Sequence, residues 1–182
     1  MNNGKTVLAE VGVGPLSMAY GALLWDRPDI ELLMFEPHPV YFRQLVEAAG
    51  ARQNVKLFNV AIGDENGTML FCDDGTSSSL VGVESPKIQH YGLAGKTNFS
   101  VDVRRISEFD HGQIDLLRVD TEGAEWFCLK HLVSRPKQIV VEMYNDLATY
   151  INPFLYEIEG WAKQNGYKKV QIADSDFVYQ LP

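Results

Sequence analysis

Cysteine is scarce in this sequence, which has only Cys72 and Cys128 among its 182 residues. The two could form at most one disulfide, and neither belongs to a Cys-x-x-Cys pair of the kind that binds a metal. A free cysteine is usually a small buried residue, and free thiols persist in reducing compartments. We therefore expect two buried thiols, no cysteine-bound metal and a cytoplasmic protein.

Basic residues are also few, with 16 Lys and Arg against 24 Asp and Glu and a formal net charge of −8 at pH 7. Nucleic acids and anionic membranes are bound through clusters of Lys and Arg that neutralise phosphate. The acidic balance therefore excludes a general affinity for nucleic acid or membrane, although it remains compatible with a local basic pocket.

Long apolar runs and repeats are absent as well. The first apolar segment is interrupted by Glu10, a carboxylate that a signal peptide or a membrane-spanning helix would not carry. The apolar fraction of 46% lies in the globular range of about 45–50%, which excludes wholesale disorder. The length is that of one domain, roughly 100–200 residues, so we expect a single soluble domain over residues 1–182.

Short apolar runs alternate with segments of helical periodicity, a pattern typical of βα units around a parallel sheet. Strands are predicted over residues 6–11, 31–35, 54–59, 114–119 and 138–143. Helices are predicted over residues 16–25, around 42–49, around 124–132 and around 154–162, and a closing hairpin over 167–172 and 177–181. The sequence therefore predicts a doubly wound α/β fold.

The stretch from about residue 64 to 105 interrupts this rhythm. Thr68–Cys72 and Phe99–Val103 alternate like an antiparallel pair, and the Gly/Ser/Thr-rich segment 73–95 between them is too polar to be core. Long loops in compact domains are usually functional or disordered. We therefore predict an insert that either faces the substrate or is a mobile surface loop.

The turn after the first predicted strand reads Glu10-Val11-Gly12-Val13-Gly14. In open α/β sheets, ligands bind at the carboxyl ends of the strands where the strand order reverses, and glycines there allow the backbone to approach a ligand. The dinucleotide fingerprint is incomplete because Ser17 occupies its third glycine position. The Glu10 carboxylate suits a cationic ligand and disfavours a pyrophosphate; the alternative is an ordinary turn with a surface glutamate.

Glu36 ends the second predicted strand, 24 positions beyond Gly12. An acidic residue roughly 20 positions after a glycine turn of this kind accepts hydrogen bonds from ribose hydroxyls. Ala61 and Ile62, just past the third predicted strand, could offer an apolar face and backbone N–H groups to an adenine edge. The alternative for Glu36 is a charge at the start of the next helix.

The most specific segment runs from residue 115 to 126 and places Asp120 at the end of the fourth predicted strand, beside the same crevice. Thr121 is a candidate N-cap of the following helix, and Glu122 and Glu125 suit the positive end of its dipole. Capping accounts well for Thr121 and Glu125. It accounts less well for Asp120 and Glu122, which are therefore candidate functional residues.

On these residues the chain resembles the FkbM-type S-adenosylmethionine-dependent methyltransferases, a family of the seven-stranded methyltransferase superfamily. The matching motifs are Glu10–Gly14 in part, Phe35-Glu36-Pro37-His38-Pro39, Asn54-Val55 with Ala61-Ile62-Gly63-Asp64, Ser78-Ser79-Leu80, Ile114–Glu125 and Val140-Val141-Glu142. The chain departs from the family pattern at Pro15-Leu16, where Ile-Gly is commoner, and at Arg118 and Thr121. The resemblance covers about residues 7–181, nearly the whole chain.

The resemblance implies a Rossmann-like, seven-stranded, mostly parallel sheet with a C-terminal antiparallel hairpin. It implies S-adenosylmethionine as cofactor, with the sulfonium near the first turn, bound by Glu10, Gly12, Gly14, Glu36, Pro37, Ala61 and Ile62. The acceptor is expected to be a small molecule or glycan that is methylated on a hydroxyl, whose proton a base would take. Asp120 is the first candidate for this base or for orienting the acceptor, followed by Glu122 and Glu142; His38 and His111 are lesser candidates.

Two other functions remain open: a nicotinamide-dependent oxidoreductase, and a non-catalytic binding module, which the short N-terminal segment and the altered Pro15-Leu16 turn suggest. Many relatives carry further N-terminal elements over the site. We therefore expect residues 73–95, residues 144–152 or another subunit of a homo-oligomer to complete the acceptor pocket. A divalent metal held by Asp120, Glu142, Asn145 and Asp146 is a further alternative. We expect no metal, because the order of Asn145 and Asp146 is reversed relative to the usual pair.

Overall fold

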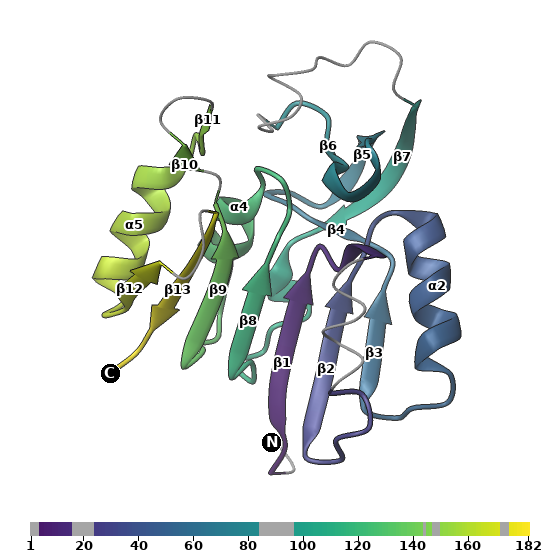
Figure 1. Cartoon of the computed structure of the whole chain (residues 1–182), viewed down its shortest axis with the longest axis horizontal. Coiled ribbons are helices and arrows are strands. Elements are labelled where there is room, and N and C mark those ends of the chain that lie inside the picture. The colour runs from purple at the N-terminus through teal and green to yellow at the C-terminus, as the bar shows by residue number, and fades with distance from the viewer. Residues whose placement is uncertain (1–3, 16–23, 84–96, 144, 147–149, 172–174) are drawn as a thin grey trace.

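The computed structural model describes residues 4–15, 24–83, 97–143, 145–146, 150–171 and 175–182. Its main sheet has seven strands in the order β12-β13-β9-β8-β1-β2-β3 (Figure 1). Their bounds are Thr6–Val11 (β1), Ile30–Phe35 (β2), Val55–Phe58 (β3), Leu116–Val119 (β8), Gln138–Glu142 (β9), Lys168–Gln171 (β12) and Asp176–Gln180 (β13). Each strand that the sequence predicts for this sheet is present, with small differences at the ends.

Strand β1 lies at the centre of the main sheet and pairs in parallel with both β2 and β8. The chain places β2 and β3 on one side of β1 and then returns to place β8 on the other side. This reversal creates the topological switch point at which ligands of open α/β sheets bind. Strand β13 runs antiparallel between β9 and β12, which confirms the predicted methyltransferase-like sheet with its C-terminal hairpin.

Helices cover both faces of the main sheet, because successive strand residues point to opposite faces. Within the described residues, the helices are α2 (Pro39–Ala49), α4 (Glu125–Lys130) and α5 (Leu155–Gln164). Val7 and Val11 of β1 pack in one apolar cluster with residues of α4 and α5. Leu32 of β2 packs in a second cluster with Leu45 of α2, on the opposite face. The fold is therefore doubly wound, as predicted.

A second sheet of four strands, in the order β4-β7-β5-β6, is built from the predicted insert and from the two residues of β4, which precede it. Its strands are β4 (Ala61–Ile62), β5 (Gly67–Asp73), β6 (Ser79–Leu80) and β7 (Thr97–Arg104). Strands β5 and β7 form the predicted antiparallel pair. Phe71, Leu80, Val101 and Val103 are buried in an apolar cluster of their own, so the described part of the insert is a packed unit.

The prediction of a polar loop over residues 73–95 is wrong for its first part. The short 3-10 helix η1 (Gly75–Ser77) and strand β6 follow β5 directly. Leu80 is the reason, because it pairs with Phe71 across the sheet and is buried, although the residues before it, Ser77–Ser79, are small and polar. Residues 84–96 lie outside the described part of the chain, as do residues 16–23 of the predicted first helix.

The remaining described elements are small. A second 3-10 helix, η2 (Ile106–Glu108), follows β7, and strands β10 (Asn145–Asp146) and β11 (Tyr150–Ile151) pair with each other. Both cysteines are buried thiols outside any disulfide, as predicted. Among the described residues, no helix has the length and apolar character needed to cross a membrane.

Candidate functional site

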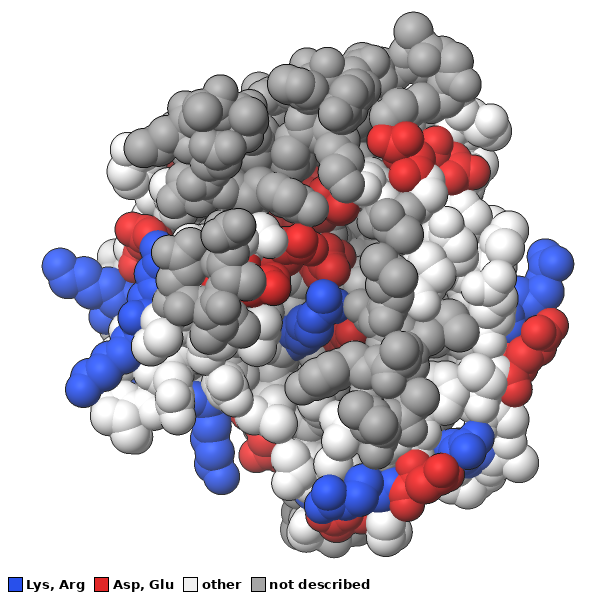
Figure 2. All heavy atoms as spheres, in the orientation of Figure 1, with Lys and Arg blue, Asp and Glu red and all other residues white. Residues whose placement is uncertain are grey.

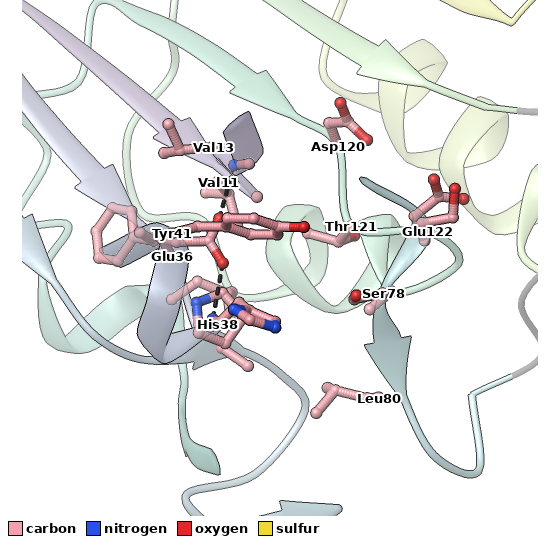
Figure 3. Close-up of a pocket in the computed structure, with 18 of the residues that line it drawn as sticks. Val11, Val13, Glu36, His38, Tyr41, Ser78, Leu80, Asp120, Thr121 and Glu122 are labelled. Carbon is pink, nitrogen blue, oxygen red and sulfur yellow. Dashed lines mark hydrogen bonds between the residues drawn. The ribbon is translucent and has the colours of Figure 1, made fainter. Parts of the chain in front are cut away.

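A cavity of about 280 Å³ lies at the carboxyl ends of β1, β2 and β8 and is also bordered by the second sheet (Figure 3). It is lined by Val11–Pro15, Phe35–His38, Tyr41, Val60–Ile62, Phe71, Gly75, Ser77, Ser78, Leu80, Arg118, Asp120–Glu122, Ala124, Glu142 and Asp176. This size is close to the small end of ligand sites, about 300–1,000 Å³. Every residue predicted to bind cofactor or act in catalysis lines the cavity, with the exceptions of Glu10 and the lesser candidate His111.

Gly12 fixes the distance between the first turn and the end of β8. Its φ of +77° is in the left-handed region, and a Cβ at this position would lie 1.6 Å from the Asp120 carbonyl oxygen. No side chain fits there, so only glycine allows the backbone after β1 to lie in direct contact with the backbone of Asp120. Gly12 thus has a packing role in addition to the ligand contact that the sequence predicts for it.

Glu36 is buried at the cavity wall, with 3% of its surface exposed. Its Oε2 accepts a hydrogen bond from the Gly14 N–H at 2.6 Å, and its Oε1 accepts one from the His38 N–H at 2.7 Å. Burial raises the pKa of Glu36, and the two backbone N–H groups oppose this by stabilising the carboxylate. A carboxylate oxygen has two acceptor sites, so each oxygen can accept a further bond from a ligand hydroxyl.

Glu10 does not line the cavity. It is buried on the sheet, and its Oε1 accepts a hydrogen bond from Arg118 Nη1 at 3.1 Å. The reason is the register of the two strands, which pairs Glu10 of β1 with Arg118 of β8. The prediction of direct ligand contact by Glu10 therefore has no support in this geometry; Glu10 meets the cavity through Arg118.

Asp120 directly follows β8 and lies between two partners. Arg118 Nη2 donates to Asp120 Oδ2 at 2.9 Å, and the Glu142 side chain hydrogen-bonds to Asp120. Burial raises the pKa of Asp120, while the bond to Glu142 and the charge of Arg118 act in the opposite direction. Two carboxyl groups in one hydrogen bond share a proton and titrate as a pair. The structure therefore joins two predicted catalytic residues, Asp120 and Glu142, in one unit.

The neighbourhood of this pair is acidic. Asp176 of β13 also lines the cavity, and both burial and the charge of Glu142 raise its pKa. Ser175 Oγ donates to Glu142 Oε1 at 3.3 Å. Figure 2 shows acidic side chains gathered around a basic one near the middle of the viewed face. This end of the cavity favours a neutral or cationic ligand over an anionic one.

Glu122 is held in a strained conformation at the cavity edge, with a φ of +54°. Positive φ is uncommon outside glycine, and such residues cluster at functional sites. Glu125 holds this turn in place, since its Oε1 accepts bonds from the Gly123 N–H at 2.9 Å and from Thr121 Oγ1 at 3.0 Å. The predicted N-cap role of Thr121 is wrong, because α4 begins after Ala124 and Thr121 serves Glu125 instead.

Several lining residues were not predicted. Arg118 was seen only as a departure from a motif, and Tyr41, Phe71, Ser77 and Asp176 were not singled out. Tyr41 lies in the first turn of α2 and Phe71 lies on β5, and these elements meet at the cavity only in the folded chain. Tyr41 follows the Phe35-to-Pro39 motif by two positions. This closeness in sequence to a predicted cofactor motif is the one signal that could have identified it.

Other predicted candidates are placed elsewhere. His111 is exposed and does not line the cavity. The side chains of Asn145 and Asp146 lie outside the part of the chain that the structure describes. In the part of the chain that is described, no group of three or more His, Cys, Asp and Glu side chains is arranged to hold a metal ion.

Comparison with known proteins identifies the family of the chain. Residues 13–169 match the methyltransferase FkbM domain family. No curated protein matches the sequence.

Solved structures share the fold at low identity. Aeropyrum pernix fibrillarin in complex with natively bound S-adenosyl-L-methionine has a TM-score of 0.53 and 10% identity, covering 97% of this chain and 65% of that one. An O-methyltransferase family protein from Burkholderia thailandensis has a TM-score of 0.51 and 10% identity, covering 97% and 51%. The ribosomal protein L11 methylase from Lactobacillus delbrueckii subsp. bulgaricus has a TM-score of 0.50 and 12% identity, covering 100% and 73%. This chain thus spans between half and three quarters of these relatives, and the likeness establishes the methyltransferase fold.

Proposed function

The chain belongs to the methyltransferase FkbM domain family, and on this premise we propose that it transfers a methyl group from S-adenosylmethionine to a hydroxyl of a sugar or natural-product acceptor. The observation that carries the proposal is the buried Glu36 carboxylate at the switch point, fixed by two backbone N–H groups and facing the cavity. A neutral small molecule or glycan is the proposed acceptor, and nucleic acid and membrane are not proposed as partners. A homo-oligomer in which another subunit completes the acceptor pocket remains a proposal.

The residues present fit this cofactor. Glu36 offers acceptor oxygens to the two ribose hydroxyls, and Ala61, Ile62 and Leu80 offer apolar surface to an adenine ring. Asp120 supplies negative charge for the cationic half of the cofactor. When bound, S-adenosylmethionine supplies a methyl group on a positively charged sulfur, and its transfer is an in-line displacement that depends on alignment.

Asp120 is the proposed general base. Its Oδ atoms accept the proton that leaves the acceptor hydroxyl as the oxygen bonds to the methyl carbon. The hydrogen bond from Glu142 and the charge of Arg118 favour the carboxylate form of Asp120 and so oppose the effect of burial on its pKa. Arg118 and its second partner Glu10 hold Asp120 in position. Glu122 is proposed to orient the acceptor, because its strained backbone fixes its side chain at the cavity edge.

Binding of the product S-adenosylhomocysteine separates this proposal from the oxidoreductase alternative. Titration calorimetry of the full chain with S-adenosylhomocysteine and, separately, with NAD is expected to show saturable binding of the first and none of the second. The acidic surroundings of the cavity disfavour the pyrophosphate of NAD. Binding of NAD without S-adenosylhomocysteine would overturn the proposal. Binding of S-adenosylhomocysteine without turnover of labelled cofactor against a pool of glycans and alcohols would favour the non-catalytic module.

Methyl transfer is expected to be independent of a divalent metal. The carboxylate of Asp120 already has Arg118 as its cationic partner, and a second cation beside that guanidinium would be repelled. Activity with labelled cofactor should therefore survive exhaustive EDTA treatment. Loss of activity that Mg²⁺ restores would instead make Asp120 a metal ligand.

A further inference from the structure

A buried ion pair lies in the centre of the main sheet, and only one of its two members lines the cavity. Glu10 of β1 is 1% exposed, and its Oε1 accepts a hydrogen bond from Arg118 Nη1 of β8. The strand register places Met34 of β2 beside Glu10 and Val140 of β9 beside Arg118. An ion pair between apolar neighbours contributes little net stability, because desolvation of the charges offsets their attraction. We therefore looked for a role of this pair in the cavity.

The guanidinium of Arg118 bridges two carboxylates. Its Nη1 donates to Glu10 at 3.1 Å, and its Nη2 donates to Asp120 Oδ2 at 2.9 Å. Arg118 and Asp120 are two positions apart, so their side chains lie on the same face of the sheet. The Asp120 N–H donates to the Val11 carbonyl oxygen and so continues the pairing of β8 with β1. The strand pairing thus places one positive charge between two negative charges.

This shared guanidinium affects how strongly Asp120 holds a proton. A cation beside a carboxylate favours the ionised form and lowers its affinity for a proton. When the same cation also compensates a second carboxylate, its effect on the first is smaller, because the negative charge of the second opposes it. A general base accelerates a reaction more when its proton affinity is higher, as long as it is ionised at the working pH.

We propose that Glu10 is a positioning residue of the active site: by sharing the Arg118 guanidinium with Asp120, it keeps the proposed base a stronger proton acceptor than a carboxylate with Arg118 to itself. Glu10 has this effect without contacting the cofactor, because it does not line the cavity. This inference rests on the proposed function. The other charged groups around Asp120 and Arg118 stay in place when Glu10 is replaced; they are Glu122 and Glu125 after β8, Glu142 of β9 and Asp176 of β13.

Glu10→Gln tests the proposal, because glutamine keeps the shape of the side chain and an acceptor oxygen for Arg118 but removes the charge. Carbon NMR of protein isotopically labelled at the aspartate carboxyl carbons follows the titration of Asp120, and Asp120→Asn assigns its signal. The proton affinity of Asp120 should fall roughly three- to tenfold, the effect of removing one nearby charge at an effective dielectric constant of about 20. Because Asp120 and Glu142 titrate as a pair, this fall applies to the pair.

The kinetics of Glu10→Gln should change in the same direction. The fall of kcat on the acid side of its pH profile should move to lower pH, and kcat at its plateau should decrease because the base is weaker. The affinity for S-adenosylhomocysteine, measured by calorimetry, should change little.

Two further variants separate this role from a structural one. Glu31→Gln removes a carboxylate of β2 that pairs with Lys56 away from the cavity, and it should leave the titration of Asp120 unchanged. Glu10→Asp keeps the charge on a shorter side chain, so the proton affinity of Asp120 should lie between those of the unmodified protein and Glu10→Gln. A purely structural role of Glu10 predicts the larger deviation for the shorter side chain. Thermal unfolding measures the stability of each variant separately.

An unchanged titration of Asp120 in Glu10→Gln would overturn the proposal. Weaker binding of S-adenosylhomocysteine without a change in that titration would overturn it too, and would make Glu10 a cofactor-binding residue. If Glu10→Gln does not fold, a titration in Glu10→Asp equal to that of the unmodified protein overturns the proposal. The NMR titration needs no turnover, so it stands apart from the proposed function, which fails if the unmodified protein does not bind S-adenosylhomocysteine.

Discussion

Asp120→Asn is expected to lower kcat for methyl transfer by roughly 10²–10⁴-fold, the usual contribution of a general base. Asparagine keeps the shape of the side chain and one acceptor oxygen, but it cannot take the proton of the acceptor hydroxyl. Arg118 keeps its bond to Glu10, so the sheet around the site should remain intact. Affinity for S-adenosylhomocysteine, measured by calorimetry, should change little in comparison with kcat.

Asp102→Asn is the matched control, because Asp102 is a half-exposed carboxylate of β7 that pairs with Arg104 outside the cavity. It should keep full activity. If Asp120→Asn keeps normal kcat while Glu142→Gln loses it, the base is Glu142 and the assignment to Asp120 is wrong.

The titration of Asp120 should affect the pH dependence of both activity and stability. Burial raises its pKa, so activity should fall, as pH decreases, at a higher pH than an ordinary carboxyl would give. A folded-state pKa above the unfolded value means that the contribution to stability is full below the unfolded pKa and is lost as pH rises through the folded pKa. Asparagine does not titrate, so the unfolding temperature of Asp120→Asn minus that of the unmodified protein should increase as pH rises above about 4, the pKa of an ordinary aspartate. A constant difference would show that Asp120 has no raised pKa.

Glu36→Ala is expected to weaken S-adenosylhomocysteine binding by a hundredfold or more. Each hydrogen bond to a buried charged group contributes about 1.5–3 kcal/mol, and two ribose hydroxyls would lose their acceptor. The variant also leaves the Gly14 and His38 N–H groups without the carboxylate that now accepts from them, which loosens the first turn. Calorimetry at matched protein concentrations, with thermal unfolding to confirm the folded state, measures the effect.

The control for Glu36 lies on the same strand. Glu31, at the opposite end of β2, makes an ion pair with Lys56 away from the cavity. Glu31→Ala should bind S-adenosylhomocysteine normally. Glu36→Gln keeps one acceptor oxygen and should fall between the unmodified protein and Glu36→Ala. Near-normal affinity in folded Glu36→Ala would contradict the ribose assignment and the proposed function with it.

The sequence by itself determined the main sheet and most of the cavity. Alternating and continuous apolar runs are local signals, and they located the strands of the main sheet to within a few residues. Parallel strands end at one edge, so Gly12, Glu36 and Asp120, each next to a strand end, could be expected at one site before any contact was known. The family motifs pointed to the same residues.

Contacts between distant segments were decided only by the tertiary structure. Glu10 follows the strand pattern, but the register of β1 against β8 gives it Arg118 as a partner, and Arg118, not Glu10, lines the cavity. The pairing of Asp120 with Glu142, and the arrival of Phe71 at the cavity from the second sheet, likewise depend on how separate elements pack. The periodicity of a segment predicts which face of the sheet a side chain lies on. It does not predict which other side chain lies beside it, because that depends on strand register and on the placement of whole sheets.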